Sequence, residues 1–263
     1  MERVELLGII IEASPTIAIS AFAVEFRKAV EGMLVLCNAH LLCHRHGELV
    51  CLAALPERTM YLHASHHSPG VRFADARVRI VETLHKAVVD MDALDPAPVA
   101  TTAALGRFLC HAHKRAEALG ERLSSRVLVL KLGDDIPSQY NTMMNCIFAA
   151  QRHGITIDSC VLSPQTSILM KQATQLTRGV YLHVAQRTGF EDLPVYLLSA
   201  FAASPSCRKH LRLPLVDEID FRAACFCHKP PRILDRGWVC AICLSVYCDD
   251  HTKCACFEGP PAS

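Results

Sequence analysis

Residues 126–162 read "RVLVLKLGDDIPSQYNTMMNCIFAAQRHGITIDSCVL", and this stretch decides the fold class. The apolar runs at 126–132 and 155–162 predict strands that are buried on both faces of a parallel sheet. Between them, residues 134–154 predict a helix that ends at Gly154. Two strands joined through a helix by short connections form a βαβ unit, in which both strands belong to one sheet. The stretch therefore predicts an α/β protein.

The same alternation continues on both sides of this stretch. We expect strands at 5–13, 48–55, 58–63 and 180–184, and helices at 16–43, 78–94, 101–119, 163–179 and 189–204. Only Pro56 and Glu57 separate two of these strands, which predicts a hairpin and hence one antiparallel pair. The whole pattern predicts a mainly parallel, Rossmann-type sheet with helices on both faces.

The chain divides into three parts. Residues 1–205 carry the pattern of strands and helices and are expected to form one domain. A polar connector, interrupted by Pro214, follows at 206–220, and residues 221–263 form a small cysteine-rich module. A chain of 263 residues is long enough for one large domain with such an appendage.

The charge balance and the hydropathy restrict the classes of function. The 27 Lys and Arg residues nearly equal the 26 Asp and Glu residues, so we expect direct contact with nucleic acid to be minor. The most apolar segment, 17–43, is interrupted by charges such as Glu25, Arg27 and Glu31. We therefore expect no membrane-spanning helix. The first residues show no secretory pattern, which suggests a reducing compartment.

The last part of the chain concentrates the cysteines. Seven of the 14 cysteines lie within residues 225–256, together with His228 and His251. The seven are Cys225 and Cys227, Cys240 and Cys243, the single Cys248, and Cys254 and Cys256. Pairs of cysteines this close together are typical of structural zinc sites. A module this short cannot bury enough surface to fold unaided, and a bound zinc ion would contribute on the order of 10 kcal/mol.

The spacing leaves the ligand pairing open. One closed site would use Cys240, Cys243, Cys254 and Cys256, and a second would use Cys225, Cys227 and Cys248 with either His228 or His251. Alternatively, the pairs Cys225–Cys227 and Cys240–Cys243 would form a zinc ribbon. We expect one zinc ion, with a second as the alternative. Each arrangement is closed and leaves no position for a catalytic water.

Several motifs together resemble one known family. They are "DFRAACFCH" at 220–228, "GWVCAICLSVYC" at 237–248, "TRGVYLHV" at 177–184 and the opening stretch at 126–162. In this combination they resemble the smaller von Willebrand A-type subunits of transcription factor IIH (TFIIH), and the resemblance spans nearly the whole chain. The last cysteine pair departs from the family, because only one residue separates Cys254 from Cys256 where the family usually has two.

The resemblance implies both a fold and a role. The fold would be a von Willebrand A domain, with one antiparallel edge strand, followed by a zinc module. The role would be that of a non-enzymatic, nuclear subunit of the TFIIH core, which acts in transcription initiation by RNA polymerase II and in nucleotide excision repair. The main partner would be the larger von Willebrand A-type subunit, and the contact would be made through that partner's C-terminal zinc domain. Apolar surface that only the complex covers is then expected on the domain.

Many von Willebrand A domains bind Mg²⁺ through a motif that follows the first strand. Here the corresponding positions are Glu12, Ser14 and Thr16, and the carboxylate is one methylene longer than the usual Asp. Because Mg²⁺ demands near-ideal octahedral geometry, we expect this site to be vestigial. The other corners would come from Thr101, Thr102, Asp134 and Asp135. The alternative interpretation is that Ser14, and Thr101 or Thr102, simply cap helices.

Other functions and sites compete with these interpretations. The zinc module could belong to a RING-type ubiquitin ligase, although the spacing does not follow the usual RING series. A metal-dependent adhesion module is disfavoured by Glu12 and by the missing secretory pattern.

Finally, His40 and His44 have the i, i+4 spacing of metal ligands near the end of a helix, where a histidine also interacts favourably with the helix dipole.

Overall fold

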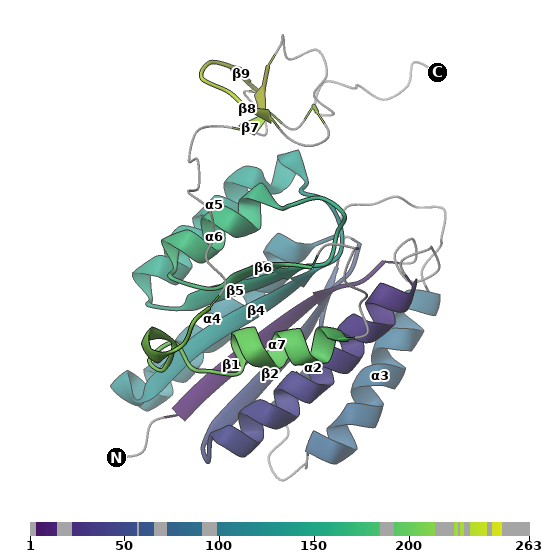
Figure 1. Ribbon diagram of the computed structural model, residues 1–263, viewed down its shortest axis with the longest axis vertical. Coiled ribbons are helices and arrows are strands. Elements are labelled where there is room, and N and C mark those ends of the chain that lie inside the picture. Colours follow the sequence, from purple (N-terminus) through teal and green to yellow (C-terminus); the bar gives the residue numbers. More distant parts are fainter. Residues whose placement is uncertain are drawn as a thin grey trace.

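The protein is described by a computed structural model. The structure describes residues 4–14, 23–56, 58–65, 73–90, 99–184, 192–213, 224–225, 227–228, 232–240 and 244–248. These ranges form a large α/β domain and a small lobe that follows it in the chain (Figure 1).

The large domain is built on a six-stranded sheet with the order β3-β2-β1-β4-β5-β6. The strands are β1 (Val4–Glu12), β2 (Gly47–Ala54), β3 (Thr59–Ala64), β4 (Leu123–Lys131), β5 (Thr156–Val161) and β6 (Tyr181–His183). All neighbouring pairs are parallel except β2 and β3, which form an antiparallel hairpin at one edge. The predicted α/β class, the hairpin and the mainly parallel sheet are confirmed.

Helices cover both faces of the sheet (Figure 1). They are α2 (Ala23–Cys43), α3 (Phe73–Val89), α4 (Thr101–Leu119), α5 (Tyr140–Arg152), α6 (Ile168–Leu176) and α7 (Leu193–Phe201). Helices α2, α3 and α7 pack on one face, and α4, α5 and α6 pack on the other. None of these described helices combines the length and the hydropathy that crossing a bilayer requires.

The central strand β1 supplies side chains to both layers. Leu7, Ile9 and Ile11 lie in the core under α2, α3 and α7. Leu6 and Ile10 lie in the core under α4, α5 and α6. Successive side chains of a strand point to opposite faces of the sheet, so a strand that is covered on both faces must be apolar at every position. This requirement explains the unbroken apolar run in the sequence.

Some predicted helix boundaries were wrong. Helix α3 begins at Phe73, five residues before the predicted Val78, because Phe73 and Ala76 continue its buried stripe. Helix α6 begins at Ile168 rather than at residue 163, and the Ser167 hydroxyl caps it by accepting a bond from the Met170 amide at 3.1 Å. Residues 16–22 of the predicted helix 16–43 lie outside the described residues, and helix α2 is described from Ala23 onward.

A buried ionic network holds the end of the large domain against the sheet. The Arg126 guanidinium on β4 donates to the carbonyl oxygens of Ala202 and Ala203, which follow α7, at 3.1 and 3.0 Å. The Arg208 guanidinium donates two bonds, of 2.6 and 2.5 Å, to the Asp158 carboxylate on β5. The Asp158 carboxylate also accepts the Val180 amide at 2.8 Å. The segment after α7 is thus fastened to the middle of the sheet.

The small lobe contains two short hairpins. Strands β7 (Ala224–Cys225) and β8 (Arg232–Ile233) pair in one, and β9 (Trp238–Val239) and β10 (Val246–Tyr247) pair in the other. The lobe contacts the large domain through the buried Ser245, whose hydroxyl donates to the carbonyl oxygen of Pro137 at 2.9 Å. Pro137 precedes α5, and Figure 1 shows the lobe beyond the α5–α6 layer.

Gly8 provides a test of the packing between β1 and α4. A Cβ atom at Gly8 would lie 2.3 Å from the Phe108 ring, so Gly8→Ala should lower the free energy of unfolding by about 1–3 kcal/mol through overpacking. Gly106→Ala is the matched control, because a Cβ there meets only the Cys146 sulfur, at 3.9 Å. The control should be neutral or stabilising by up to about 1 kcal/mol. Urea unfolding measures both, and equal stabilities would contradict this account.

Candidate metal centre and the carboxyl edge of the sheet

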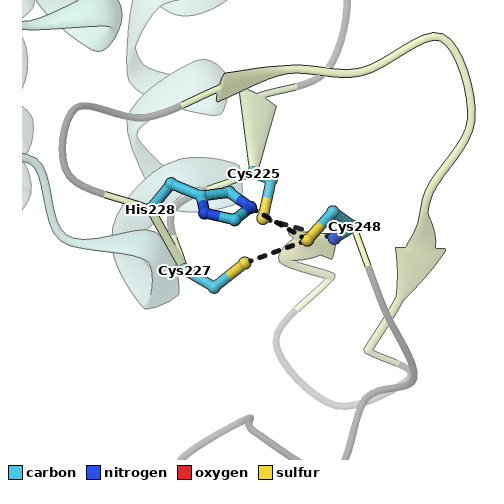
Figure 2. A group of neighbouring side chains, drawn as sticks. All are labelled: Cys225, Cys227, His228 and Cys248. Atoms are coloured by element: carbon cyan, nitrogen blue, oxygen red, sulfur yellow. Dashed lines mark hydrogen bonds between the residues drawn. The ribbon is translucent and has the colours of Figure 1, made fainter.

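The small lobe gathers four potential metal ligands. The sulfur atoms of Cys225, Cys227 and Cys248 and a ring nitrogen of His228 all lie within 4.8 Å of one another (Figure 2). Cys225 lies at the end of β7 and Cys248 directly follows β10, and the contact between these two strands brings them together. The Cys248 amide donates to the Cys225 sulfur at 3.2 Å. This is the only such group among the residues that the structure describes.

The distances within this cluster suit a tetrahedral ion. In a zinc site with metal–sulfur bonds of about 2.3 Å, neighbouring ligand atoms lie roughly 3.7 Å apart. Here the sulfurs of Cys227 and Cys248 are 3.4 Å apart, and the His228 Nε2 atom is 3.1 Å from the Cys248 sulfur. Three thiols and one imidazole form a ligand set that zinc accepts. The cluster therefore offers the ligands for one metal ion.

Cys240 does not join this group. It is fully buried beside Tyr247 in the second hairpin. Its amide donates to the Ser245 carbonyl oxygen at 2.9 Å, and its own carbonyl oxygen accepts the Leu244 amide at 2.8 Å. Both bonds link the end of β9 to the residues just before β10. The other predicted ligands, Cys243, Cys254, Cys256 and the alternative His251, lie outside the described residues.

The second predicted site lies at the carboxyl edge of the sheet, which is the side where the parallel strands have their C-terminal ends. Glu12 ends β1 there. Both oxygens of the buried Glu12 carboxylate accept hydrogen bonds. Oε2 accepts the backbone amides of Leu132 and Gly133 at 2.9 and 2.8 Å. Oε1 accepts the Thr101 hydroxyl at 2.5 Å and the Lys131 ammonium at 3.2 Å. Four donors thus surround the carboxylate that would have to bind a metal.

Lys131, the last residue of β4, points into the centre of this cluster. Its Nζ atom lies 3.2 Å from the Asp134 carbonyl oxygen and 3.5 Å from the Asp135 carboxylate. Only 6% of the Lys131 side chain is exposed. Burial by itself would lower the pKa of this ammonium, but the carboxylates of Glu12 and Asp135 outweigh burial, and the pKa is raised. The Lys131 ammonium therefore lies beside two carboxylates that favour its charged form.

Asp134 and Asp135, also predicted for this site, have structural partners. The Asp135 carboxylate accepts the Ser167 hydroxyl at 2.5 Å and the Leu169 amide at 3.1 Å, and so holds the start of α6. The Asp134 carboxylate accepts the Ser163 hydroxyl at 2.9 Å. Ser14 is buried, and Thr16 lies outside the described residues.

The predicted capping role of the two threonines was wrong. Ala100 is the N-cap of α4, and no side chain caps it. Thr101 and Thr102 are instead the first helical residues. The Thr101 hydroxyl binds Glu12, and the Thr102 hydroxyl donates to the Gln139 side chain at 2.9 Å. These bonds join helix α4 to the carboxyl edge of the sheet.

Lys131 was not identified from the sequence. It lies within "RVLVLKL", the run at 126–132 that predicts a strand. The available signal was that a charged residue in a strand buried on both faces must have a partner of opposite charge. Glu12 ends another such strand, but it is 119 residues away in the sequence. Only the register between β1 and β4 brings the two together.

The histidines at the end of α2 do not form a metal site with described residues. His40 is buried, and its Nε2 atom lies 3.0 Å from the Glu5 carbonyl oxygen. Burial lowers the pKa of His40 to about 4, so its imidazole is neutral at physiological pH. The ring packs against His44, with 4.7 Å between the ring centroids. His40 therefore joins α2 to β1 and has a structural role.

Comparisons with known proteins agree with this architecture. The model of the family "Transcription factor Tfb4" matches residues 4–258, which include both the sheet and the cysteine lobe. The chain belongs to the Tfb4 family. Among solved structures, the crystal structure of the TFIIH p34 N-terminal domain covers 74% of this chain and 96% of its own, with a TM-score of 0.61 and 24% identity. The SpRpn10 VWA domain gives a TM-score of 0.52 at 9% identity, which marks the fold as von Willebrand A-like.

Curated relatives of this Tfb4-family chain have consistent names. The "General transcription and DNA repair factor IIH subunit tfb4" of Schizosaccharomyces pombe is 32% identical over 265 residues, which cover 95% of this chain and 86% of that protein. The TFB4 subunit of Arabidopsis thaliana is 29% identical, with coverages of 97% and 88%. The "General transcription factor IIH subunit 3" of Dictyostelium discoideum is 39% identical, but over only 40% of that protein.

The ion pair at the carboxyl edge provides the test for this site. Glu12→Gln removes one of the two carboxylates beside the buried Lys131 ammonium, and should destabilise the protein by about 3 kcal/mol. Glu31→Gln is the matched control, because Glu31 forms an exposed ion pair with Lys28 at 3.0 Å. Its cost should stay below about 1 kcal/mol. Chemical denaturation of both variants measures the difference, and a Glu12→Gln variant as stable as the control would refute the assignment.

Proposed function

We propose that this Tfb4-family chain is a non-catalytic structural subunit of the TFIIH core, which supports transcription initiation by RNA polymerase II and nucleotide excision repair. The observation that carries this proposal is the family match along residues 4–258. In addition, relatives that are named as TFIIH subunits match this chain across most of their own length. A nuclear location accompanies this role. The relatives' names give no support to the ubiquitin-ligase alternative.

A structural role agrees with the chemistry of the described residues. At the carboxyl edge, the charged groups of Glu12, Lys131 and Asp135 are buried and bind one another and nearby hydrogen-bond donors. Groups held in this way are poorly suited to exchange protons with a substrate. With 27 basic against 26 acidic residues, the chain also lacks the excess positive charge that binding to nucleic acid by itself requires.

The metal of the small lobe is proposed to be zinc. Thiolates and imidazole in a closed four-ligand set favour zinc, and the lobe itself buries very few apolar side chains among its described residues. Cys225, Cys227, His228 and Cys248 would hold the ion and thereby join the two hairpins. A second ion at Cys240, Cys243, Cys254 and Cys256 is the alternative that metal analysis would detect.

Cys248→Ser tests the zinc centre. The variant should lose one zinc ion per chain and the order of the lobe, because Cys248 is the only ligand of the cluster that belongs to the second hairpin. Cys207→Ser is the matched control, since Cys207 is an exposed cysteine outside the lobe, and it should keep the full zinc content. Elemental analysis of the purified proteins gives the counts. A wild-type chain without zinc would overturn the assignment.

The proposed main partner is the larger von Willebrand A-type subunit of TFIIH. A surface between α2 and α3 supports a docking role, because an open groove of about 650 Å³ lies there. Apolar side chains line most of it: Phe26, Val30 and Leu34 from α2, and Val81, Leu84 and Val88 from α3. Val78 and Val81 on α3 are 55% and 42% exposed. Such apolar surface is typical of a face that a partner covers.

Val81→Asp tests this docking surface. A buried carboxylate in the interface should weaken copurification with the larger subunit at least about tenfold, or by roughly 1.4 kcal/mol. Val195→Asp on α7 is the matched control, because Val195 is a helical valine that is 62% exposed, and it should bind like the wild type. Equal binding by both variants would exclude the groove but leave the function intact. A wild-type chain that captures no TFIIH subunit would overturn the function itself.

A further inference from the structure

The Lys131 ammonium occupies a cage of oxygen atoms. Its three N–H donors face three acceptors, which are the Glu12 carboxylate at 3.2 Å, the Asp134 carbonyl oxygen at 3.2 Å and the Asp135 carboxylate at 3.5 Å. The Thr101 hydroxyl lies against the same Glu12 oxygen at 2.5 Å. Carboxylate, carbonyl and hydroxyl oxygens are also the ligands that hard divalent cations prefer. The cage would therefore suit such a cation if the amine were absent.

The position of the cage in the fold is that of a metal site. Its groups come from the end of β1, the end of β4 with the loop that follows it, and the start of α4. Glu12, Thr101, Asp134 and Asp135 are also residues that the sequence analysis predicts for a vestigial Mg²⁺ site. The two carboxylates are each only 2% exposed, so their charges need a nearby cation. The lysine supplies it from within the chain.

We propose that the Lys131 ammonium is a built-in replacement for the divalent cation, and that removing the amine converts the cage into a site for a hard cation such as Mn²⁺. The long Glu12 side chain fits this arrangement. Its second oxygen accepts the amides of Leu132 and Gly133, while the first reaches the ammonium. A carboxylate held in this way positions β1 against the loop after β4 without a metal.

The proposal has a consequence for recognition. A divalent cation with an open coordination position can bind an acidic group of a partner as a ligand. Here the cation is 94% buried and bound on three sides, so a partner acid cannot reach it. Any contact that the described residues of this cage make with a partner is therefore independent of divalent cations. This consequence follows from the cage and does not rest on the proposed function.

Lys131→Ala tests the proposal directly. Electron paramagnetic resonance of Mn²⁺ should show no Glu12-dependent binding to the wild type, but one ion per chain for Lys131→Ala, with a dissociation constant below about 1 mM. At roughly 100 times that constant, Mn²⁺ should raise the Tm of the variant by about 5–10 °C. Lys28→Ala, which removes an exposed lysine from an ion pair with Glu31, should behave like the wild type.

Further variants separate this site from other metal-binding groups. Adding Glu12→Gln to Lys131→Ala should weaken Mn²⁺ binding at least about tenfold, because a neutral amide replaces a charged ligand. Mn²⁺ bound at the cysteine cluster would be unaffected by this change. If Lys131→Ala is unfolded without metal, recovery of the fold on adding Mn²⁺ supports the proposal.

Lys131→Ser, which keeps a hydroxyl donor beside Glu12, is the second variant. If neither Lys131 variant folds in the presence of Mn²⁺, or if neither binds the ion, the proposal is overturned. Glu12-dependent Mn²⁺ binding by the wild type would overturn it as well.

Discussion

The carboxyl edge of the sheet depends on the buried ion pair between Lys131 on β4 and Glu12 on β1. Desolvating two charges is costly, and their attraction offsets that cost only when their remaining hydrogen-bonding atoms are satisfied. Here the second Glu12 oxygen accepts the Leu132 and Gly133 amides, and the ammonium also reaches the Asp134 carbonyl oxygen and the Asp135 carboxylate. One pair thereby positions two central strands, the loop after β4 and, through Thr101, helix α4.

A second polar network completes the domain. Arg126, Asp158 and Arg208 lie on the central strands and on the segment after α7, and they fasten that segment to the sheet. Between the two networks the interior is apolar on both faces of β1. A body with its charges paired inside and apolar side chains on α3 outside is suited to binding other proteins rather than to transforming a substrate. This agrees with the proposed place of a Tfb4-family chain in TFIIH.

The small lobe follows a different physical principle. Its strands are two residues long, and Cys240 and Tyr247 are the only members of its described apolar cluster. Such a unit needs a cross-link to remain folded, and the four ligands at Cys225, Cys227, His228 and Cys248 are placed to provide one. The hydrogen bond from the Ser245 hydroxyl to the Pro137 carbonyl oxygen then holds the lobe against the large domain. A metal in the lobe would therefore stabilise both the lobe and its orientation.

Much of this protein was predictable from the sequence, because local patterns are encoded by neighbouring residues. The continuous apolar runs predicted β1, β4 and β5, the short connection at Pro56 predicted the hairpin of β2 and β3, and helix Thr101–Leu119 was predicted as well. The cysteine spacing indicated a metal lobe. Helix starts were less predictable, because Phe73 and Ser167 act through tertiary contacts and capping.

Only the tertiary structure decided that Lys131 meets Glu12, that Arg208 meets Asp158, and that Cys248 joins Cys225 while Cys240 does not. Each of these contacts joins segments that are distant in the sequence, and its existence depends on strand register and loop closure, which no local pattern specifies.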